Sequence, residues 1–222
     1  MLTLVLTRHG LTPRSDPEQH LGQHVDIGLS DAGREQAAAL ATRIAGERFD
    51  RIVSSPLLRA RQTVAAVAEG RSVELDPRLM EMDYGRWEGL TYEEIEATDP
   101  TYRRRWEADP AAMPCPDGES GDDVARRAGS FLEDLLAWAP GAGPDPVVLA
   151  VAHSSLNRIL LCVAMQVPVR EYRRRFTQAQ VNISALRYTL GAGVGQARLL
   201  VLNDLGHVHA PDLAPWELRP GA

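Results

Sequence analysis

The chain has 222 residues, enough for one large domain or two small ones, and its 44% hydrophobic and 24% charged residues are the composition of an ordinary globular protein. Its formal net charge of −6 argues against a nucleic-acid-binding protein, which would present a basic surface, but is compatible with a locally positive pocket for an anion. No apolar segment reaches the roughly 18 residues that span a bilayer, and the N-terminus lacks the basic region of a secretory signal.

The first third of the chain alternates between short β-branched runs and longer segments with a helical apolar period. Strands are predicted at 2–7, 51–55 and 73–75, helices at 31–48 and 56–69, and an aperiodic loop at 11–29. Ser30 has the features of an N-cap, and Pro56 suits the first turn of the second helix. This order predicts a parallel sheet with helices on both faces.

The pattern changes after residue 81. Residues 84–119 mix two tryptophans, charged runs and four prolines, and we expect a partly helical insertion that lies over the sheet. Beyond it, helices are predicted at 122–137 and 155–165, strands at 147–152, 183–189 and 197–202, and loops at 139–146 and over the last fifteen or so residues. Trp87 and Trp106 are expected to pack in the interior rather than stack on a ligand.

The only two cysteines are Cys115 and Cys162. Two cysteines make no disulfide framework, so we expect a protein of the reducing cytoplasm. Cys162 lies in an apolar run, which predicts a buried thiol in the core.

Histidines follow two of the predicted strands at the point where each strand ends. His9 follows the strand over 2–7, and His153 follows the strand over 147–152. Because ligands of an open parallel sheet bind outside the carboxyl ends of its strands, both imidazoles should emerge at the same edge. Arg8 stands beside His9, Arg59 begins the helix after the second strand, and Glu81 follows the third strand. The sequence therefore predicts that these five side chains meet at one end of the sheet.

Phosphoryl transfer requires residues of these types. The fork of an arginine matches two phosphoryl oxygens, so Arg8 and Arg59 are suited to clamp a phosphoryl group. A neutral imidazole is a good nucleophile toward phosphorus, and two nearby guanidiniums should keep His9 neutral. Glu81 is the candidate proton donor for the leaving group, provided that its pocket favours the protonated acid. His153, if protonated, would add a third positive donor.

Four segments carry a pattern that points to one family. They are Arg8-His9-Gly10, the Ser-Ser-Pro-Leu-x-Arg-Ala-x-Gln-Thr run over 54–63, the stretch over 81–89, and Val151-Ala152-His153. In this order they resemble the histidine phosphatase superfamily, which includes the cofactor-dependent phosphoglycerate mutases. Within it, the chain looks like the phosphatase branch.

The resemblance implies a role for each matching residue. His9 would become phosphorylated, Arg8, Arg59 and His153 would bind the phosphoryl oxygens, and Glu81 would donate the proton. It implies an α/β fold, a three-layer α/β/α sandwich with a mostly parallel central sheet, as a single domain over 1–222 with an insertion at about 84–119 over the active site. It also implies a hydrolase of the histidine acid phosphatase type that needs neither a metal nor an organic cofactor.

The sequence departs from the family pattern at three places in the pocket. Pro13-Arg14 replaces the usual Trp-Asn, Gly22-Gln23 appears where many relatives have Gln-Gly, and Ser154-Ser155 replaces Gly-Gly or Gly-Asn. These changes leave the phosphoryl-binding residues intact but put the substrate in doubt. The candidate substrate-pocket residues are Thr12, Gln23 and Ser154.

Other titratable residues have simpler interpretations. Asp83 and Glu88 lie near Glu81 and are alternative acids. The pairs His20 and His24, and His207 and His209, have no carboxylate or thiolate partners at metal-ligand spacing in the sequence, so solvated loop histidines are favoured. The arginine runs at 103–105 and 173–175 are expected to be solvated, although either could meet a second anionic group on the substrate.

The leading functional hypothesis is a phosphomonoesterase that acts on a small phosphorylated metabolite. The alternatives are a phosphoglycerate mutase, a protein phosphohistidine phosphatase and a non-catalytic phosphate-binding protein. Glu81 and His153 lie 72 positions apart, which resembles the shorter interval of the phosphatases rather than that of the mutases. The expected partner is a small phosphate ester and not a nucleic acid or a membrane, while the identity of the ester and the formation of a homodimer stay open.

Overall fold

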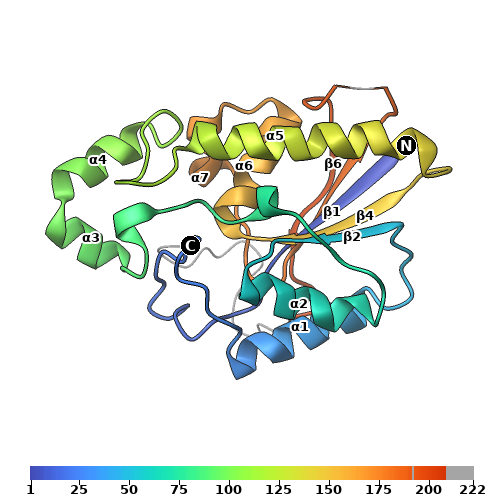
Figure 1. The fold of residues 1–222 in the computed structure, drawn as a ribbon, viewed down its shortest axis with the longest axis horizontal. Helices are drawn as coiled ribbons and strands as arrows, with labels where there is room; N and C mark the ends of the chain where they lie inside the picture. Colours follow the sequence, from blue (N-terminus) through green and yellow to red (C-terminus); the bar gives the residue numbers. More distant parts are fainter. Residues whose placement is uncertain (192, 209–222) are drawn as a thin grey trace.

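The computed structural model describes residues 1–191 and 193–208. Its centre is one six-stranded sheet in the order β3-β2-β4-β1-β5-β6 (Figure 1). The strands are β1 (Leu2–Arg8), β2 (Arg51–Ser54), β3 (Glu74–Leu75), β4 (Val147–Ala152), β5 (Ile183–Tyr188) and β6 (Arg198–Asp204). The first four are parallel, and β5 and β6 pair antiparallel at one side. The mostly parallel sheet expected from the sequence is confirmed.

Helices cover both faces of this sheet, which makes three layers (Figure 1). One face carries α1 (Asp31–Arg43) and α2 (Leu58–Ala68), and the other carries α5 (Gly121–Trp138) and α6 (Ser154–Met165). Each face has its own apolar core: Leu40 and Val64 pack against the sheet on the first face, and Phe131 and Leu156 on the second. The sandwich predicted from the strand and helix order is thus observed.

The two helices of the first face are shorter than predicted. Ser30 does cap α1, since its side chain accepts a hydrogen bond from the amide of Gly33. The helix nevertheless ends at Arg43 rather than residue 48, and Gly46 then takes a φ of +81°, a left-handed conformation that ends helices. Helix α2 begins at Leu58, two residues after Pro56.

The predicted insertion stands beyond the carboxyl ends of the parallel strands (Figure 1). It contains a 3-10 turn η2 (Gly85–Trp87) and the helices α3 (Tyr92–Thr98) and α4 (Pro100–Ala108). Thr91 caps α3 through a capping box, and Asp99 caps α4. Trp87 and Trp106 are buried edge to face with their ring centroids 5.5 Å apart, so both are packing residues as expected.

Several short elements were not predicted. They are the 3-10 turns η1 (Pro77–Leu79), η3 (Ala139–Gly141) and η4 (Val169–Glu171), and the one-turn helix α7 (Tyr172–Arg175).

Both cysteines are buried thiols. Within the described ranges, no helix is long and apolar enough to cross a membrane. The expected loop at the C-terminus and His209 fall outside the described residues.

Candidate active site

The two strand-end histidines lie side by side at the carboxyl edge of the sheet. The backbone amide of His9 donates to the carbonyl of Ala152 at 3.0 Å, which extends the β1–β4 ladder by one residue. The ring centroids of His9 and His153 are 5.2 Å apart, and both rings are buried. The placement expected from two parallel strand ends is therefore observed.

The hydrogen bond of the His9 ring assigns its tautomer, and that of the His153 ring is compatible with a proton on Nδ1. Nδ1 of His9 lies 2.7 Å from the carbonyl oxygen of Gly10, so Nδ1 carries the proton and Nε2 keeps its lone pair. Nε2 of His153 lies 2.7 Å from Oγ of Ser55, which in turn accepts from the amide of Leu57. The hydroxyl can then donate to Nε2, which leaves Nδ1–H of His153 as a donor without a partner among the described residues.

Burial and neighbouring charges make both imidazoles neutral. Burial, followed by the charges of Arg59 and Arg8, lowers the pKa of His9 well below its ordinary value of 6.5. Burial, followed by Arg59 and His9, lowers the pKa of His153 in the same way. The neutral His9 agrees with the sequence argument. The protonated state that would make His153 a third positive donor is disfavoured in this pocket, because burial opposes its charge.

Each of the two arginines is fixed by backbone carbonyls. Nη2 of Arg59 donates to the carbonyls of Leu21 at 2.9 Å and Gly22 at 2.8 Å, and the side chain is fully buried on the first turn of α2. Arg8 donates from Nη1 to the carbonyl of Gln178 and from Nη2 to the carboxylate of Glu18. In both residues the buried Nε has no hydrogen-bond partner within the described residues.

Glu81 lies against the N-terminus of α6, just after His153. Its Oε1 accepts from the amides of Met82 at 2.8 Å and Leu156 at 3.1 Å, and its Oε2 accepts from the amide of Ser155 at 3.1 Å. The side chain is 4% exposed, and its charge acts on the guanidinium of Arg59. The loop after β3 thus delivers Glu81 to the same pocket, where three backbone amides donate to its carboxyl group.

Arg127 of α5 forms hydrogen bonds with the backbone of the loop that carries Glu81. Its Nη1 donates to the carbonyls of Arg78 at 2.8 Å and Met80 at 2.6 Å, and its Nη2 donates to the carbonyl of Glu81 at 3.0 Å. Its Nε and Nη2 also pair with Glu119 at 3.0 and 2.9 Å. One side chain from another element therefore sets the position of the Glu81 backbone.

The three candidate substrate-pocket residues have different surroundings. Thr12 is buried, and its hydroxyl bonds to Oγ of Ser15 at 3.1 Å. Gln23 donates from Nε2 to the carbonyl of Glu81 at 2.8 Å and to Glu119 at 3.2 Å, so it ties the 21–25 loop to the Glu81 loop. Ser154 is half-buried at the first position of α6.

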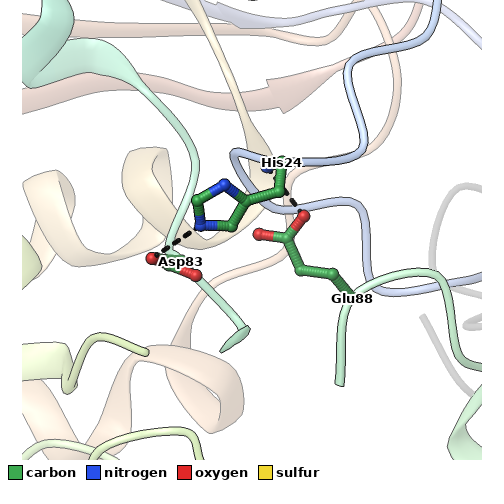
Figure 2. Close-up of side chains that lie close together, drawn as sticks. All are labelled: His24, Asp83 and Glu88. Carbon is green, nitrogen blue, oxygen red and sulfur yellow. Dashed lines mark hydrogen bonds and ion pairs between the residues drawn. The ribbon is translucent and has the colours of Figure 1, made fainter. Parts of the chain in front are cut away.

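His24 has carboxylate neighbours that its sequence spacing did not reveal. Figure 2 shows His24, Asp83 and Glu88 together, with Nε2 of His24 3.3 Å from Oδ2 of Asp83. Their possible ligand atoms lie within 4.8 Å of one another. However, Glu88 already accepts from the amides of Gln23, His24 and Val25. We therefore assign Glu88 to holding this loop, and the absence of a metal site stays a prediction.

Sequence reasoning missed two parts of the pocket. Ser55, the partner of His153, could have been found, since it ends the strand over 51–55 beside the other strand-end residues. Arg127 and its partner Glu119 could not, because nothing in an amphipathic helix shows that Arg127 reaches a distant loop, and Glu119 lies in the irregular segment before that helix. Arg103 was expected to be solvated but is fully buried, with Nε bonded to Glu107 at 3.1 Å and its guanidinium over Trp87 and Trp106.

Known proteins match this chain over most of its length. The family model described as histidine phosphatase superfamily (branch 1) matches residues 4–203. A glucosyl-3-phosphoglycerate phosphatase of Mycolicibacterium vanbaalenii is 38% identical over 172 residues, or 75% of either chain. Phosphoserine phosphatase 1 of Hydrogenobacter thermophilus is 31% identical over 176 residues, 78% of this chain and 80% of the relative.

Solved structures of similar proteins also match this chain over most of its length. The native structure of a mycobacterial glucosyl-3-phosphoglycerate phosphatase is 34% identical with a TM-score of 0.81, and the match covers 90% of this chain and 98% of that one. Sequence and fold therefore agree over nearly the whole described chain, and the protein belongs to the histidine phosphatase superfamily.

Proposed function

We propose that the chain is a phosphomonoesterase that hydrolyses a small phosphorylated metabolite through a phosphohistidine on His9. One observation carries the proposal. Around His9, three buried nitrogen atoms have no hydrogen-bond partner among the described residues: Nε of Arg8 and Nε of Arg59, which are both donors, and Nδ1 of His153, which is a donor when Ser55 donates to Nε2. Buried donors in folded proteins nearly always have a partner, and phosphoryl oxygens would supply one to each of them.

The tautomer of His9 supports its role as the nucleophile. With Nδ1–H held by the carbonyl of Gly10, the lone pair of Nε2 is available to attack phosphorus. The P–N bond forms as the ester P–O bond breaks, and Glu81 in its acid form gives a proton to the leaving oxygen. Water then attacks the phosphohistidine and transfers a proton to Glu81, the P–N bond breaks, and inorganic phosphate leaves.

The names of the relatives favour hydrolysis over mutase chemistry. A mutase must exclude water and return the phosphoryl group to a substrate, whereas both relatives described above are named as phosphatases. The finer assignments belong to the same proposal: a single domain, the histidine acid phosphatase type, a small-molecule substrate, no metal or organic cofactor, and a cytoplasmic location. An intact His9 and Glu81 speak against a non-catalytic protein.

The test compares the wild type with His9→Ala on 4-nitrophenyl phosphate and measures released phosphate. Because the variant lacks the nucleophile, we expect its kcat to fall by at least about 10³-fold. Quenching the wild type during turnover with alkaline detergent should trap a phosphoryl group on the protein that survives base but not acid. Full activity in His9→Ala would exclude the mechanism, and isomerisation of 3-phosphoglycerate without phosphate release would establish the mutase instead.

A further inference from the structure

The segment over 178–182, which precedes β5, contacts Arg8 at its backbone amide, its backbone carbonyl and its guanidinium. The amide of Arg8 donates to Oδ1 of Asn182 at 3.2 Å, and the carbonyl of Arg8 accepts from the amide of Val181 at 3.0 Å. Nη1 of Arg8 donates to the carbonyl of Gln178 at 3.1 Å. One short segment outside the motifs of the sequence therefore holds both the backbone and the side chain of a residue that we assign to phosphoryl binding.

These contacts continue the hydrogen bonding of β1 beyond its pairing with β5. The two strands pair only from Leu2 to Leu6 of β1. On the opposite side, the amide of His9 donates to β4, and since neighbouring residues of a strand direct their amide and carbonyl groups to opposite sides, those of Arg8 point away from β4. The segment over 178–182 supplies the partners that these two groups need.

The side chain of Asn182 is held by a buried network of polar groups. Asn182, Gln178 and Ser184 are fully buried. A backbone amide can only donate, so Oδ1 of Asn182 faces Arg8 and its Nδ2 faces the other way. There Nδ2 donates to Oε1 of Gln178 and to Oγ of Ser184, both at 3.0 Å. Nε2 of Gln178 also donates to Oγ of Ser184 at 3.0 Å, so each amide has one orientation and the network is rigid.

The backbone of Val181 indicates a constraint at the same place. Its φ is +51°, a left-handed conformation that is unfavourable for a β-branched residue, and its side chain is fully buried. Its amide donates to Arg8, and its carbonyl accepts from Nε2 of His207 at 2.9 Å. Strained backbone persists where the surroundings over-determine it, and it gathers at functional sites. Here the strained residue is the one that bonds to the carbonyl of Arg8.

The contact with Gln178 also decides which nitrogen of Arg8 is available to a ligand. Nη1 of Arg8 bonds to the carbonyl of Gln178 and Nη2 bonds to Glu18, while the buried Nε has no partner among the residues that the structure describes. Because a guanidinium is planar, fixing both Nη atoms fixes the direction of the Nε–H bond. A shift of the Gln178 carbonyl would therefore turn this donor away from a phosphoryl group at His9.

We infer that Asn182 is a positioning residue for Arg8. Its side-chain oxygen fixes the backbone of Arg8 directly, and its side-chain nitrogen fixes the guanidinium of Arg8 through Gln178. The inference rests on the proposed function, since it gives Asn182 the placement of a phosphoryl-binding group. Asn182 acts through Arg8 and needs no contact with the substrate, so its removal should matter only while Arg8 is present.

The test is a double-mutant cycle between Asn182→Ala and Arg8→Ala. For the wild type, both single variants and the double variant, we measure kcat/KM with 4-nitrophenyl phosphate and the Kd of inorganic phosphate by isothermal titration calorimetry. Asn182→Ala alone should lower kcat/KM by about 10- to 100-fold and raise the Kd at least about threefold, because Arg8 loses its fixed position. With Arg8→Ala in place, the same substitution should change either quantity less than about twofold.

Two further variants separate positioning from a loss of the fold. Gln62→Ala removes another side-chain oxygen that accepts a backbone amide, that of Leu29 at 2.7 Å, and should keep the wild-type kcat/KM. Ser184→Ala keeps Asn182 but removes one partner of its Nδ2. This milder variant should lower kcat/KM by about three- to tenfold, again only in the presence of Arg8, and it completes the cycle if Asn182→Ala does not fold.

The cycle distinguishes the failure of this inference from the failure of the proposed function. Effects of Asn182→Ala and Ser184→Ala that are equal with and without Arg8, or an equal loss of activity in Gln62→Ala, would overturn the inference alone. Phosphate binding requires no turnover, so the calorimetric cycle still measures the coupling of the two residues in a protein that does not hydrolyse 4-nitrophenyl phosphate. Absence of that hydrolysis in the wild type would overturn the proposed function instead.

Discussion

The ring of His20 links the pH of the solution to the stability of the fold. Burial, opposed by a hydrogen bond from the ring to the Leu90 carbonyl, lowers the pKa of His20 from 6.5 to about 4, and the charges of Arg103 and Arg173 contribute. Between these two pH values His20 is protonated in the unfolded chain but neutral in the folded chain. The free energy of unfolding therefore falls as the pH drops from 6.5 to 4. Each such histidine contributes a slope of about 1.4 kcal/mol per pH unit in that window.

His20→Gln removes this one contribution, because glutamine does not titrate. We expect the decline of the free energy of unfolding between pH 6.5 and 4.5 to become shallower by about 1.4 kcal/mol per pH unit. Urea unfolding at four pH values measures it. A His20→Gln slope equal to that of the wild type would contradict the argument.

At the scale of elements, α5 positions the loop that carries Glu81. Arg127→Ala removes every hydrogen bond from that helix to the carbonyls of Arg78, Met80 and Glu81. We expect kcat to fall by about 10- to 100-fold for alkyl phosphates, since a small displacement of a proton donor is enough for such a loss. The loss should be smaller for 4-nitrophenyl phosphate, whose leaving group scarcely needs a proton.

Arg126→Ala is the matched control for that loss. Arg126 is the preceding residue of α5, its side chain is 74% exposed, and it pairs with Asp123. Its removal should leave kcat for both kinds of ester unchanged. Arg127→Lys keeps the charge without the fork and should recover only part of the activity. An equal loss on alkyl and aryl esters in Arg127→Ala would mean that the residue supports the fold and does not position Glu81.

The helices and strands also show how much of the fold and of the site could be predicted from the sequence. Strands flanked by turn residues and ending in histidine predicted where His9 and His153 meet, because strand ends of a parallel sheet share an edge. The one-turn helix α7 could not be predicted, since three consecutive arginines give no apolar period. The burial of Arg103 was hidden too, because it depends on three aromatic rings that the insertion folds around it: Trp87, Tyr92 and Trp106.

At the scale of the whole molecule, two electrostatic effects oppose each other. The net charge of −6 repels an approaching phosphate dianion, while the arginines at the carboxyl edge of the sheet attract it. Which effect is stronger depends on the distance between each charge and the phosphate, because charges separated by more than about 10 Å are largely screened at 0.1 M salt. Arg8 and Arg59 lie close to the two histidines of the phosphoryl pocket, since their charges lower the pKa of both imidazoles, and they would act on a phosphoryl group there at short range.

This difference in distance predicts the sign of the salt dependence. Because the nearby arginines attract the substrate, added salt screens this attraction. We therefore expect kcat/KM for 4-nitrophenyl phosphate to fall by about three- to tenfold between 10 and 500 mM NaCl. Steady-state kinetics over that range measure it, and sodium acetate at equal ionic strength separates screening from competition by chloride. A rise of kcat/KM with salt would mean that the net charge of the whole surface, and not the cationic pocket, governs the approach of the substrate.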